Sequence, residues 1–230
     1  MSEMAARSLF FGAFLTVAAY LAGQQIRSRF GKAWLNPILI SVIFIIAVLS
    51  FMDVGYQTFY QSAKYISYLL TPATICLAVP LYEQFQLLKK NLWAALGGII
   101  TGVLVSMVSV LILSRLFDFS HEQYITFLPK SITSAIGLEI SNEYGGYASL
   151  TVAVIIITGI LGNIIAEMVC RIFHITDPIA KGIAIGTSAH AIGAAKAMEM
   201  GKIEGAMSSL SIVTSGILTV ILAIAFQYFA

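Results

Sequence analysis

The sequence predicts an all-α polytopic membrane protein, a helical bundle with internal repeats and broken or re-entrant helices. Three observations lead to this fold class: the composition, a series of long apolar stretches, and two polar segments set among them. Of the 230 residues, 59% are hydrophobic and 10% are charged, whereas a soluble domain carries about 25% charged residues. Backbone polar groups must be satisfied inside lipid, and barrel strands would alternate in character, so we expect helices. Residues 1–230 are predicted to form a single integral membrane domain.

Long apolar stretches follow one another along the chain. A helix needs about 20 residues to cross about 30 Å of hydrocarbon. Several stretches approach or exceed that length, at 9–23, 35–52, 66–81, 92–114, 147–170 and 205–230. The first resembles a signal peptide, but its flanking charges are mixed and further spans follow, so we expect a retained helix.

The charges predict an orientation. Basic residues cluster at 27–32 and at 89–90. The positive-inside rule places both segments in the cytoplasm and the N-terminus outside, in a multi-pass protein of the cell membrane. Between them, 55–68 is rich in Tyr, Gln and Phe and too polar to span, so we expect an interfacial amphipathic helix there.

Signs of an enzyme or a metal protein are missing from the sequence. There is no P-loop, GxSxG, HExxH or CxxC motif, and His121 and His174 lack the spacing of metal ligands. Cys76 and Cys170 lie in apolar stretches and are interpreted as small buried hydrophobes. The net charge of +2 gives no sign of a nucleic-acid partner. We expect no enzyme activity, no metal and no cofactor.

A comparison of the chain with itself at an offset of 57 residues shows an internal repeat. Ile-Ile-Thr-Gly at 99–102 falls on the same letters at 156–159, and Pro72 falls on Pro129. Both prolines are interpreted as helix breakers, each in a short segment that precedes a long helix. Such segments at corresponding positions are typical of transporter-like folds, because free backbone groups in a membrane must line a watery cavity or meet a ligand. The units cover about 66–115 and 123–172, with a looser third copy at 176–229.

The first polar segment, 128–146, reads LPKSITSAIGLEISNEYGG. We expect Pro129 in the first turn of a helix, where its missing N–H costs nothing. Lys130 and the hydroxyls would then gather at the positive end of that helix, which suits an anion. Glu139 is a candidate for uptake of a coupled proton. The alternative is an ordinary exterior loop with a capped helix, although the segment is very apolar for one. The candidate substrate ligands are Lys130, Ser131, Thr133 and Ser134.

The second polar segment, 182–209, begins with small residues at three- and four-residue spacing, which predicts a smooth face for close helix packing. His190 is the lone ionisable group in the first part of this segment. It is interpreted as a substrate contact or proton relay, or alternatively as a structural histidine bonded to a neighbouring helix backbone. Lys196 would supply charge or lie at the membrane interface. We expect helix breaks near Pro129 and His190, with their tips facing each other. The candidate ligands of this segment are Thr187, Ser188, His190, Gly193 and Lys196.

Five short motifs are spread along the chain beyond the first helix. They are Leu35-Asn36-Pro37, Pro80-Leu81-Tyr82-Glu83-Gln84, Leu128-Pro129-Lys130-Ser131, Gly186-Thr187 with His190-Ala191-Ile192-Gly193, and Glu204-Gly205-Ala206. Together they resemble the CidB/LrgB family, close to its LrgB/YohK type of antiholin-like membrane proteins, over nearly the whole chain beyond the first helix. The sequence is also similar to the C-terminal part of the plastidic glycolate/glycerate translocator.

The chain departs from the family pattern at two places. Where the family commonly has a second proline after Lys-Ser-x-Thr-Thr, this chain has Ser134 and Ala135. Where the family often reads Gly-Thr-Ala-Ser-His-Ala-x-Gly-Thr-Ala-Arg, the serine here is Ser188, one position earlier, and the final residue is Lys196. One position is about 100° around a helix, so the side chains offered to a ligand differ.

The resemblance implies two functions of different classes. One is a membrane transporter of small monocarboxylates of the pyruvate, glycolate and glycerate class, proton-coupled and acting with an LrgA/CidA-type holin-like membrane protein. The other is an antiholin-like regulator of murein hydrolase activity, autolysis and cell death that carries no substrate of its own. The broken, polar segments favour the first, because a pore-forming lesion needs short oligomerising hairpins more than buried polar tips. A homo-oligomer in the lipid bilayer fits either function.

Overall fold

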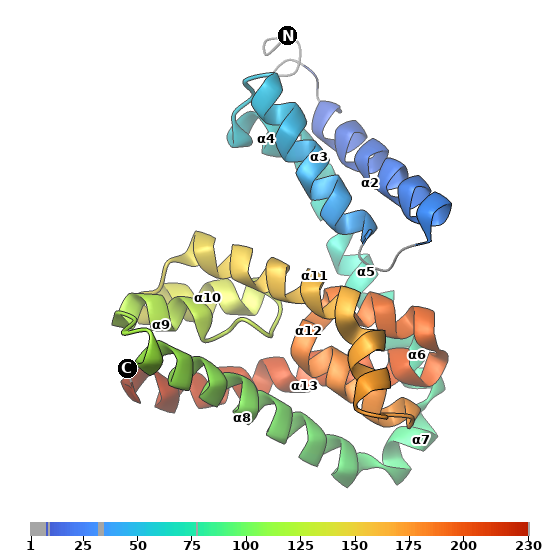
Figure 1. Ribbon diagram of the computed structural model, residues 1–230, viewed down its shortest axis with the longest axis vertical. Helices are drawn as coiled ribbons and strands as arrows, with labels where there is room; N and C mark the ends of the chain where they lie inside the picture. Colours follow the sequence, from blue (N-terminus) through green and yellow to red (C-terminus); the bar gives the residue numbers. More distant parts are fainter. Residues whose placement is uncertain (1–7, 9, 32–34, 77, 230) are drawn as a thin grey trace. The chain divides into compact units, whose positions relative to one another are not determined.

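The computed structural model describes residues 8, 10–31, 35–76 and 78–229, and every element in those ranges is helical. The predicted all-α fold class is therefore confirmed. The chain divides into two compact units, unit 1 at Met1–Cys76 and unit 2 at Leu77–Ala230 (Figure 1). The prediction of a single membrane domain over 1–230 stays a prediction.

Unit 1 contains α2 packed against α3 and α4. Close approach depends on glycine: a Cβ on Gly23 would lie 2.7 Å from the Pro37 carbonyl oxygen. Asn36 starts α3, because its side chain accepts a hydrogen bond from Ile38 N at 2.8 Å and a proline follows at the first helical position. The helices of the unit are α2 (Phe11–Phe30), α3 (Pro37–Phe51), α4 (Tyr56–Ser67) and α5 (Leu70–Cys76).

Helix α4 is the segment predicted to be amphipathic. Its buried side carries Ser62, whose hydroxyl accepts a hydrogen bond from Gly12 N on α2 at 2.8 Å. Tyr56, Tyr60 and Tyr65 remain exposed on α4. The amphipathic helix is thus present, while its position at the membrane interface stays a prediction.

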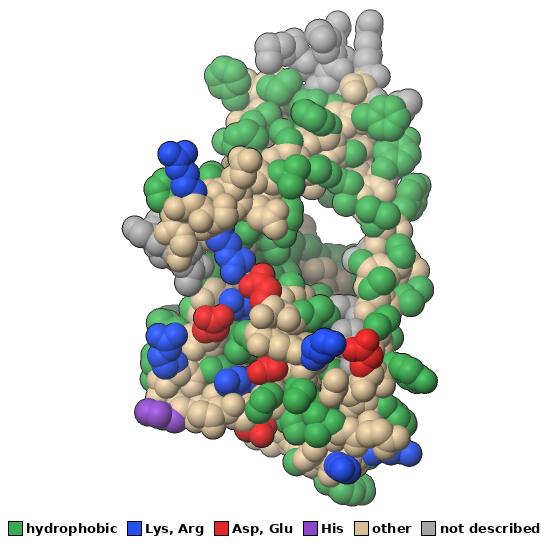
Figure 2. Space-filling view, turned by 90° about the vertical axis from the view of Figure 1, so that its right-hand side faces the viewer, with side chains coloured by type: hydrophobic (Ala, Val, Ile, Leu, Met, Phe, Trp, Pro, Cys, Tyr) green, Lys and Arg blue, Asp and Glu red, His purple; other side chains and the backbone are tan. Residues whose placement is uncertain are grey.

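Within the described residues of unit 2, three helices are long and apolar enough to cross a membrane: α8, α11, and α13 continued by η1. Ile112, Ile157 and Ile221 on these helices are each more than half exposed, and Figure 2 shows many hydrophobic side chains on one face of the molecule. A surface of this kind suits lipid. The elements are α6 (Ala78–Glu83), α7 (Phe85–Lys90), α8 (Leu92–Leu116), α9 (His121–Phe127), α10 (Ser134–Tyr144), α11 (Ala148–Ile172), α12 (Pro178–Met200), α13 (Lys202–Phe226) and η1 (Gln227–Phe229).

The apolar stretch 66–81, predicted to be a short segment interrupted by a proline, is divided among the end of α4, α5 and α6. One expectation about the cysteines is wrong. Both cysteines are free, but only Cys170 is buried, since Cys76 ends the short helix α5 and is exposed.

The core of unit 2 draws on α8, α9, α10, α12 and α13. Figure 1 shows α8 and α13 side by side along the unit. At one end, Tyr124 on α9 is fully buried and donates its hydroxyl hydrogen to the Phe226 carbonyl at 3.0 Å. This contact ties the short helix α9 to the end of α13.

Small residues let α12 pack closely on α13, as the sequence predicts. A Cβ on Gly182 would lie 2.5 Å from the Glu204 carbonyl oxygen, and one on Gly186 would collide with the backbone of Ser208. Asp177 starts α12 by accepting a hydrogen bond from Ala180 N at 2.8 Å. The predicted small-residue face is buried throughout: Gly182, Gly186, Ala189, Gly193 and Ala197.

The chain leaves helical geometry between α9 and α10, over 128–133. Pro129 follows the end of α9, so its predicted place in the first turn of a helix is wrong; α10 begins five residues later, after Thr133. Gly145 ends α10 in the left-handed conformation (φ 84°), which makes a tight turn before α11. The sequence therefore predicts the break near Pro129 correctly, but the proline follows the end of α9 and does not begin α10.

A buried hydroxyl network holds this broken segment against α11. Thr151 on α11 donates to the Thr126 carbonyl on α9 at 3.1 Å and contacts the Ser141 hydroxyl on α10 at 2.8 Å. Thr126 in turn accepts a hydrogen bond from Tyr147 N at 2.8 Å. Both halves of the segment are therefore fixed to the same neighbouring helix.

Helix α12 is interrupted at His190, whose backbone angles (φ 41°, ψ −140°) are not helical. The half-helices that follow the breaks near Pro129 and at His190 begin at Ser134 and Ala191, which are separated by the 57-residue offset of the sequence comparison. The long helices α8, α11 and α13 begin at Leu92, Ala148 and Lys202. The repeat itself stays a prediction.

Candidate functional site

A cleft of about 1140 Å³ opens within unit 2 between α8, α11 and the first half of α12. Its lining residues lie within 91–109 on α8, 158–170 on α11 and 177–188 on α12. Close approaches fix the helix directions, because Gly98 meets Ile183, Gly102 meets Thr187 and Gly162 meets Ala189. The first half of α12 therefore runs parallel to α8, and α11 runs against it, since Gly159 meets His190 while Gly162 meets Ala189. The cleft extends from one common end of these helices toward their middle.

Lys130, from the break between α9 and α10, reaches this cleft. Its Nζ donates to the Ser106 hydroxyl at 3.1 Å and to the Ser131 hydroxyl at 3.0 Å, and Ser106 donates to Ser131 at 3.1 Å. Among the described residues, the carboxylates within 4.0 Å of a lysine are those that contact Lys196, and none reaches Lys130. An ammonium held by hydroxyls alone keeps a positive charge available for an anion.

Asp177 is the one carboxylate among the residues that line the cleft. Its oxygen caps the N-terminus of α12, at the opposite end of the α12 lining from Thr187 and Ser188. Asp177 and Thr187 are ten positions apart on one helix, about 15 Å. The negative charge of Asp177 and the positive charge of Lys130, whose partners Ser106 and Ser131 line a small cavity together with Thr187, are thus separated along the cleft.

The site lies near the middle of the longest apolar elements. Ser106 stands 14 positions after Leu92 in a helix of 25 residues, so it lies about 21 Å along about 37 Å of helix. Binding sites of transporters with discontinuous helices are typically at this depth, where broken backbone is tolerated only beside a cavity.

A second, much smaller cavity of about 10 Å³ adjoins the cleft. Ser106, Ser131 and Thr187 line both cavities, and Ser215 and Thr219 from α13 line only the small one. Thr187 is 5% exposed and its hydroxyl has no hydrogen-bond partner among the described residues. A buried hydroxyl without a partner is unusual in native proteins and calls for an occupant or a function.

Hydroxyls occur on the three long helices at the 57-residue offset of the sequence comparison. Thr101 on α8, Thr158 on α11 and Ser215 on α13 follow one another at intervals of 57 residues. The first two line the cleft and the third lines the small cavity.

His190 packs against α11 and is absent from the lining of both cavities. It is 3% exposed, and its Nε2 lies 2.9 Å from the Ile155 carbonyl oxygen. A carbonyl only accepts, so Nε2 is the protonated nitrogen. The geometry matches the structural alternative, a histidine bonded to a neighbouring helix backbone; a part in substrate binding or proton coupling stays a prediction.

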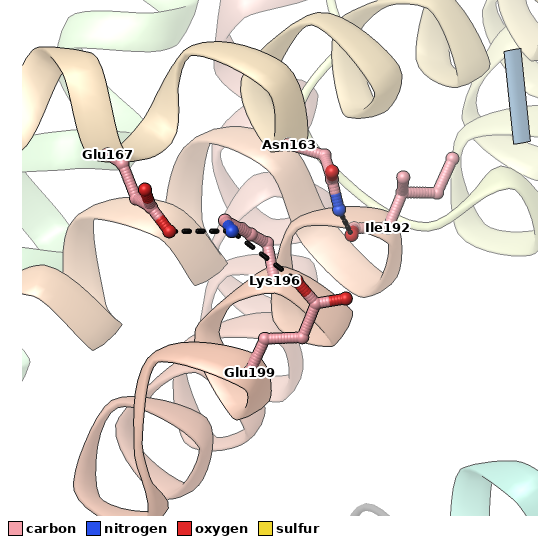
Figure 3. A network of polar contacts seen from close by, with 5 residues as sticks. All are labelled: Asn163, Glu167, Ile192, Lys196 and Glu199. Atoms are coloured by element: carbon pink, nitrogen blue, oxygen red, sulfur yellow. Dashed lines mark hydrogen bonds and ion pairs between the residues drawn. The ribbon is translucent and has the colours of Figure 1, made fainter. Parts of the chain in front are cut away.

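Lys196 also belongs to a separate polar group on α11 and the second half of α12 (Figure 3). Its Nζ lies 2.6 Å from a Glu167 oxygen and 3.4 Å from a Glu199 oxygen. Asn163 donates to the Ile192 carbonyl at 2.8 Å, just beyond the break. In this arrangement, the Lys196 charge is neutralised by two carboxylates and lies outside the cleft lining.

The structure therefore brings together part of the predicted set. Lys130, Ser131, Thr187 and Ser188 line the cleft. Thr133 and Ser134 start α10, Gly193 packs against Ala189, and Glu139 is exposed on α10. Pro72 lies in the first turn of α5, in unit 1. The predicted residues outside the lining of both cavities are Pro72, Thr133, Ser134, Glu139, His190, Gly193 and Lys196.

Sequence reasoning missed the hydroxyls contributed by the long helices, above all Ser106, the partner of Lys130. A usable signal was present, because the repeat aligns Thr101-Gly102 with Thr158-Gly159, and Thr101, Gly102 and Thr158 line the cleft. For Ser106 itself, a serine in an apolar helix gives no such signal, since its hydroxyl can bond to its own backbone.

The family comparison agrees with the motifs. The LrgB-like family model matches residues 16–228. The chain is 34% identical over 208 residues to the Holin-like protein CidB of Staphylococcus aureus (strain Mu50), which covers 90% of this chain and 91% of that protein.

Other relatives are similar over the same length. The Holin-like protein CidB of Staphylococcus epidermidis is 35% identical over 208 residues, covering 90% of this chain and 91% of its own. The Uncharacterized protein YxaC of Bacillus subtilis is 37% identical over 204 residues, covering 89% of each chain. No solved structure gives a significant match.

Proposed function

This chain belongs to the LrgB-like family, and we propose that it carries small monocarboxylates of the pyruvate, glycolate and glycerate class across the cell membrane. The single observation that carries the proposal is Lys130, a lysine whose partners in the cleft are hydroxyls. A carboxylate entering the cleft supplies the missing counter-charge. Such a site binds an anion of small size without requiring a second charged group.

The substrate carboxylate accepts hydrogen bonds from the Lys130 ammonium and from the hydroxyl of Ser131. The hydrogen bonds to Ser131 come from Lys130 and Ser106, so its own hydrogen is unused in the described part of the chain. Charge-assisted hydrogen bonds of this kind are about twice as strong as neutral ones. They would replace part of the hydration that the anion loses on leaving water.

The cleft also fits one state of an alternating-access cycle. It reaches Lys130 from the end of the helices where α8 and α12 begin. That end adjoins the basic residues Lys89 and Lys90, which the positive-inside rule assigns to the cytoplasm. In the proposed cycle this conformation binds and releases substrate at the cytoplasmic face.

Uptake into proteoliposomes tests the proposal directly. Purified protein is reconstituted with and without an LrgA/CidA-type partner, and entry of radiolabelled pyruvate, glycolate and glycerate is measured against protein-free vesicles. Saturable uptake of at least one acid, competed by the unlabelled acid, is expected. Vesicles that take up none of the acids under either condition would overturn the transport function.

Proton coupling is part of the same proposal, with Glu139 or His190 as the carrier. Glu139 is exposed on α10, whereas His190 is buried against α11. An imposed pH gradient, inside alkaline, is then expected to drive accumulation above equilibrium in the parent. A Glu139→Gln variant that still accumulates substrate would remove Glu139 from this role.

A second function is favoured by the names of the relatives, which are called holin-like. In this function the chain, with an LrgA/CidA-type partner, is an antiholin-like regulator of murein hydrolase activity and autolysis. The two functions differ in their dependence on Lys130. A Lys130→Ala protein that is inserted normally, lacks uptake and still restores normal autolysis in cells lacking the parent would separate regulation from transport.

A further inference from the structure

The small cavity adjoins the cleft at residues that surround the proposed carboxylate site. We infer that it receives an oxygen atom on the carbon next to the substrate carboxylate, and that Thr187 determines this specificity. The inference rests on the proposed transport of monocarboxylates and deepens it. It distinguishes acids that bear a 2-oxo or 2-hydroxyl group from plain fatty acids of the same length.

The cavity has the size of a single heavy atom. Its volume of about 10 Å³ is close to the minimum that holds one water. Half of the residues that line the cavity carry hydroxyls (Ser106, Ser131, Thr187, Ser215 and Thr219) and the other half are apolar. A methyl group with its hydrogens is larger than the cavity, whereas an oxygen atom fits and can bond to the hydroxyls.

The wall between the two cavities consists of hydroxyls. Ser106, Ser131 and Thr187 are the residues common to both linings. An acid whose carboxylate contacts Lys130 therefore meets the small cavity at the three residues that bound it. Carbon 2 of the acid is bonded directly to the carboxylate, so a substituent on carbon 2 is the one that enters the small cavity.

Thr187 has the unused hydrogen-bonding capacity that this oxygen needs. Its side chain is 5% exposed, and its hydroxyl has no partner among the described residues. A hydroxyl can donate to a 2-oxo oxygen and can also donate to or accept from a 2-hydroxyl group. On the other side of the cavity, the Ser215 hydroxyl is bonded to the Ile212 carbonyl at 3.2 Å and has acceptor capacity left.

The methyl group of Thr187 packs against Gly102 of α8. A Cβ placed on Gly102 would lie 2.7 Å from Thr187 Cγ2 and 3.9 Å from its Oγ1. The methyl group is thus turned toward Gly102, which makes room for it, and the hydroxyl lies farther from this glycine.

Selectivity follows from the cost of an unpaired buried hydroxyl. An acid with a 2-oxygen satisfies Thr187, whereas acetate or propionate leaves it without a partner. A buried polar group left unsatisfied costs enough to change affinity about 10- to 100-fold. Sites built to hydrogen-bond a substrate hydroxyl reject the analogue that lacks it strongly.

The test compares acids that differ by one oxygen. Inhibition constants of glycolate and acetate, and of lactate and propionate, are measured against labelled glycolate uptake in proteoliposomes. The parent is expected to prefer the oxygenated acid of each pair about 10- to 100-fold. Equal inhibition constants within each pair, in a parent that transports, would mean that the small cavity holds an ordered water and no substrate atom. This result would overturn the inference while leaving transport intact.

Variants assign the preference to a residue. Thr187→Val replaces the hydroxyl by a methyl group of similar size and is expected to lower the glycolate-to-acetate preference about tenfold or more, mainly by weakening glycolate. Thr187→Ser keeps the hydroxyl and is expected to keep the preference. The matched control is Thr101→Val, which removes a hydroxyl that lines the cleft and not the small cavity.

Two results would overturn the role of Thr187: an unchanged preference in Thr187→Val, or an equal loss in Thr101→Val. If Thr187→Val does not fold, Ser215→Ala provides the second variant, because it removes a hydroxyl of the small cavity from α13. A parent that takes up none of these acids overturns the proposed transport itself, which is a different and recognisable failure.

Discussion

At the scale of single residues, the most informative contact is the one between Lys130 and two serines. A buried or half-buried ammonium needs hydrogen-bond acceptors, and hydroxyls provide them without adding negative charge. Lys196 illustrates the opposite case, because Glu167 and Glu199 neutralise it. Two lysines of one chain thus have different electrostatic surroundings, and only Lys130 has a charge to offer in the cleft.

The first prediction compares three lysines. Lys130→Ala is expected to reduce uptake about 10- to 100-fold, the range expected for loss of a charge-assisted hydrogen bond. Lys89→Ala and Lys196→Ala are the controls, one on the short helix α7 and the other paired with carboxylates. Both are expected to retain uptake within a few-fold of the parent. The measurement is initial uptake per inserted protein, and equal losses in all three variants would contradict the role of Lys130.

The second prediction concerns the backbone of His190. Its φ of 41° lies where non-glycine residues are strained by about 1–3 kcal/mol. His190→Gly relieves that strain and His190→Ala does not, so the glycine variant is expected to unfold at the higher temperature of the two. The measurement is thermal unfolding in detergent. An alanine variant more stable than the glycine variant would show that this position is not strained.

His190→Gln separates the roles of the side chain. Glutamine keeps a donor for the Ile155 carbonyl but does not titrate. A hydrogen-bonding role predicts that the folded Gln variant retains part of the uptake that Ala loses. A proton relay predicts that both lose gradient-driven accumulation, and a purely structural role predicts that Gln transports like the parent at every pH.

At the scale of elements, the broken helices are held by their neighbours at defined points. Helix α11 contacts α12 through His190, through Asn163 and through the Glu167–Lys196 pair. All three contacts involve residues 190–196, at and just after the break. The second half of α12 is therefore tied to α11, whereas the first half lies along the cleft and packs on α13.

The third prediction tests the α12–α13 packing. Gly186→Ala is expected to destabilise the protein by about 1–3 kcal/mol, because the new methyl group collides with the Ser208 backbone. Gly97→Ala on α8 is the matched control, since no atom lies within 4 Å of a Cβ placed there. It is expected to be neutral or to stabilise by up to about 1 kcal/mol through helix propensity. The measurement is the thermal unfolding temperature of each variant relative to the parent. Equal shifts in the two variants would contradict the packing argument.

At the scale of the whole molecule, the arrangement within unit 2 allows access from one side. The cleft is lined by α8, α11 and α12 from their common end to the level of Lys130. Beyond that level, the core residues of α8, α9 and α13 fill the interior, with Val110 and Tyr124 buried. A transport cycle therefore requires that this packed part open while the cleft closes.

The fourth prediction is the sidedness of α8. In a background with Cys76 and Cys170 replaced by alanine, single cysteines are placed at Lys90, before α8, and at Phe117, after it. The positive-inside rule predicts that a membrane-impermeant maleimide added to intact cells labels Phe117→Cys and not Lys90→Cys. Permeabilised cells are expected to label both. The reverse pattern would invert the orientation and place the cleft on the outer side.

Composition and local spacing were enough to predict part of this fold. Apolar length placed the three long helices, and proline and polar residues located the first break. These features follow from backbone and solvent preferences within a few residues. The positions of Lys130 and Thr187 could also be singled out in this way.

Which polar groups contact each other depends on how the helices pack, and the sequence alone did not predict it. Lys130 and Ser106 are 24 positions apart, and His190 and Ile155 are 35 positions apart. Helical periodicity contains no information about contacts between helices at such separations, because they depend on how the apolar and small faces pack. The same packing gave Lys196 its carboxylate partners and buried the Thr187 hydroxyl, which has no hydrogen-bond partner in the part of the chain that the structure describes.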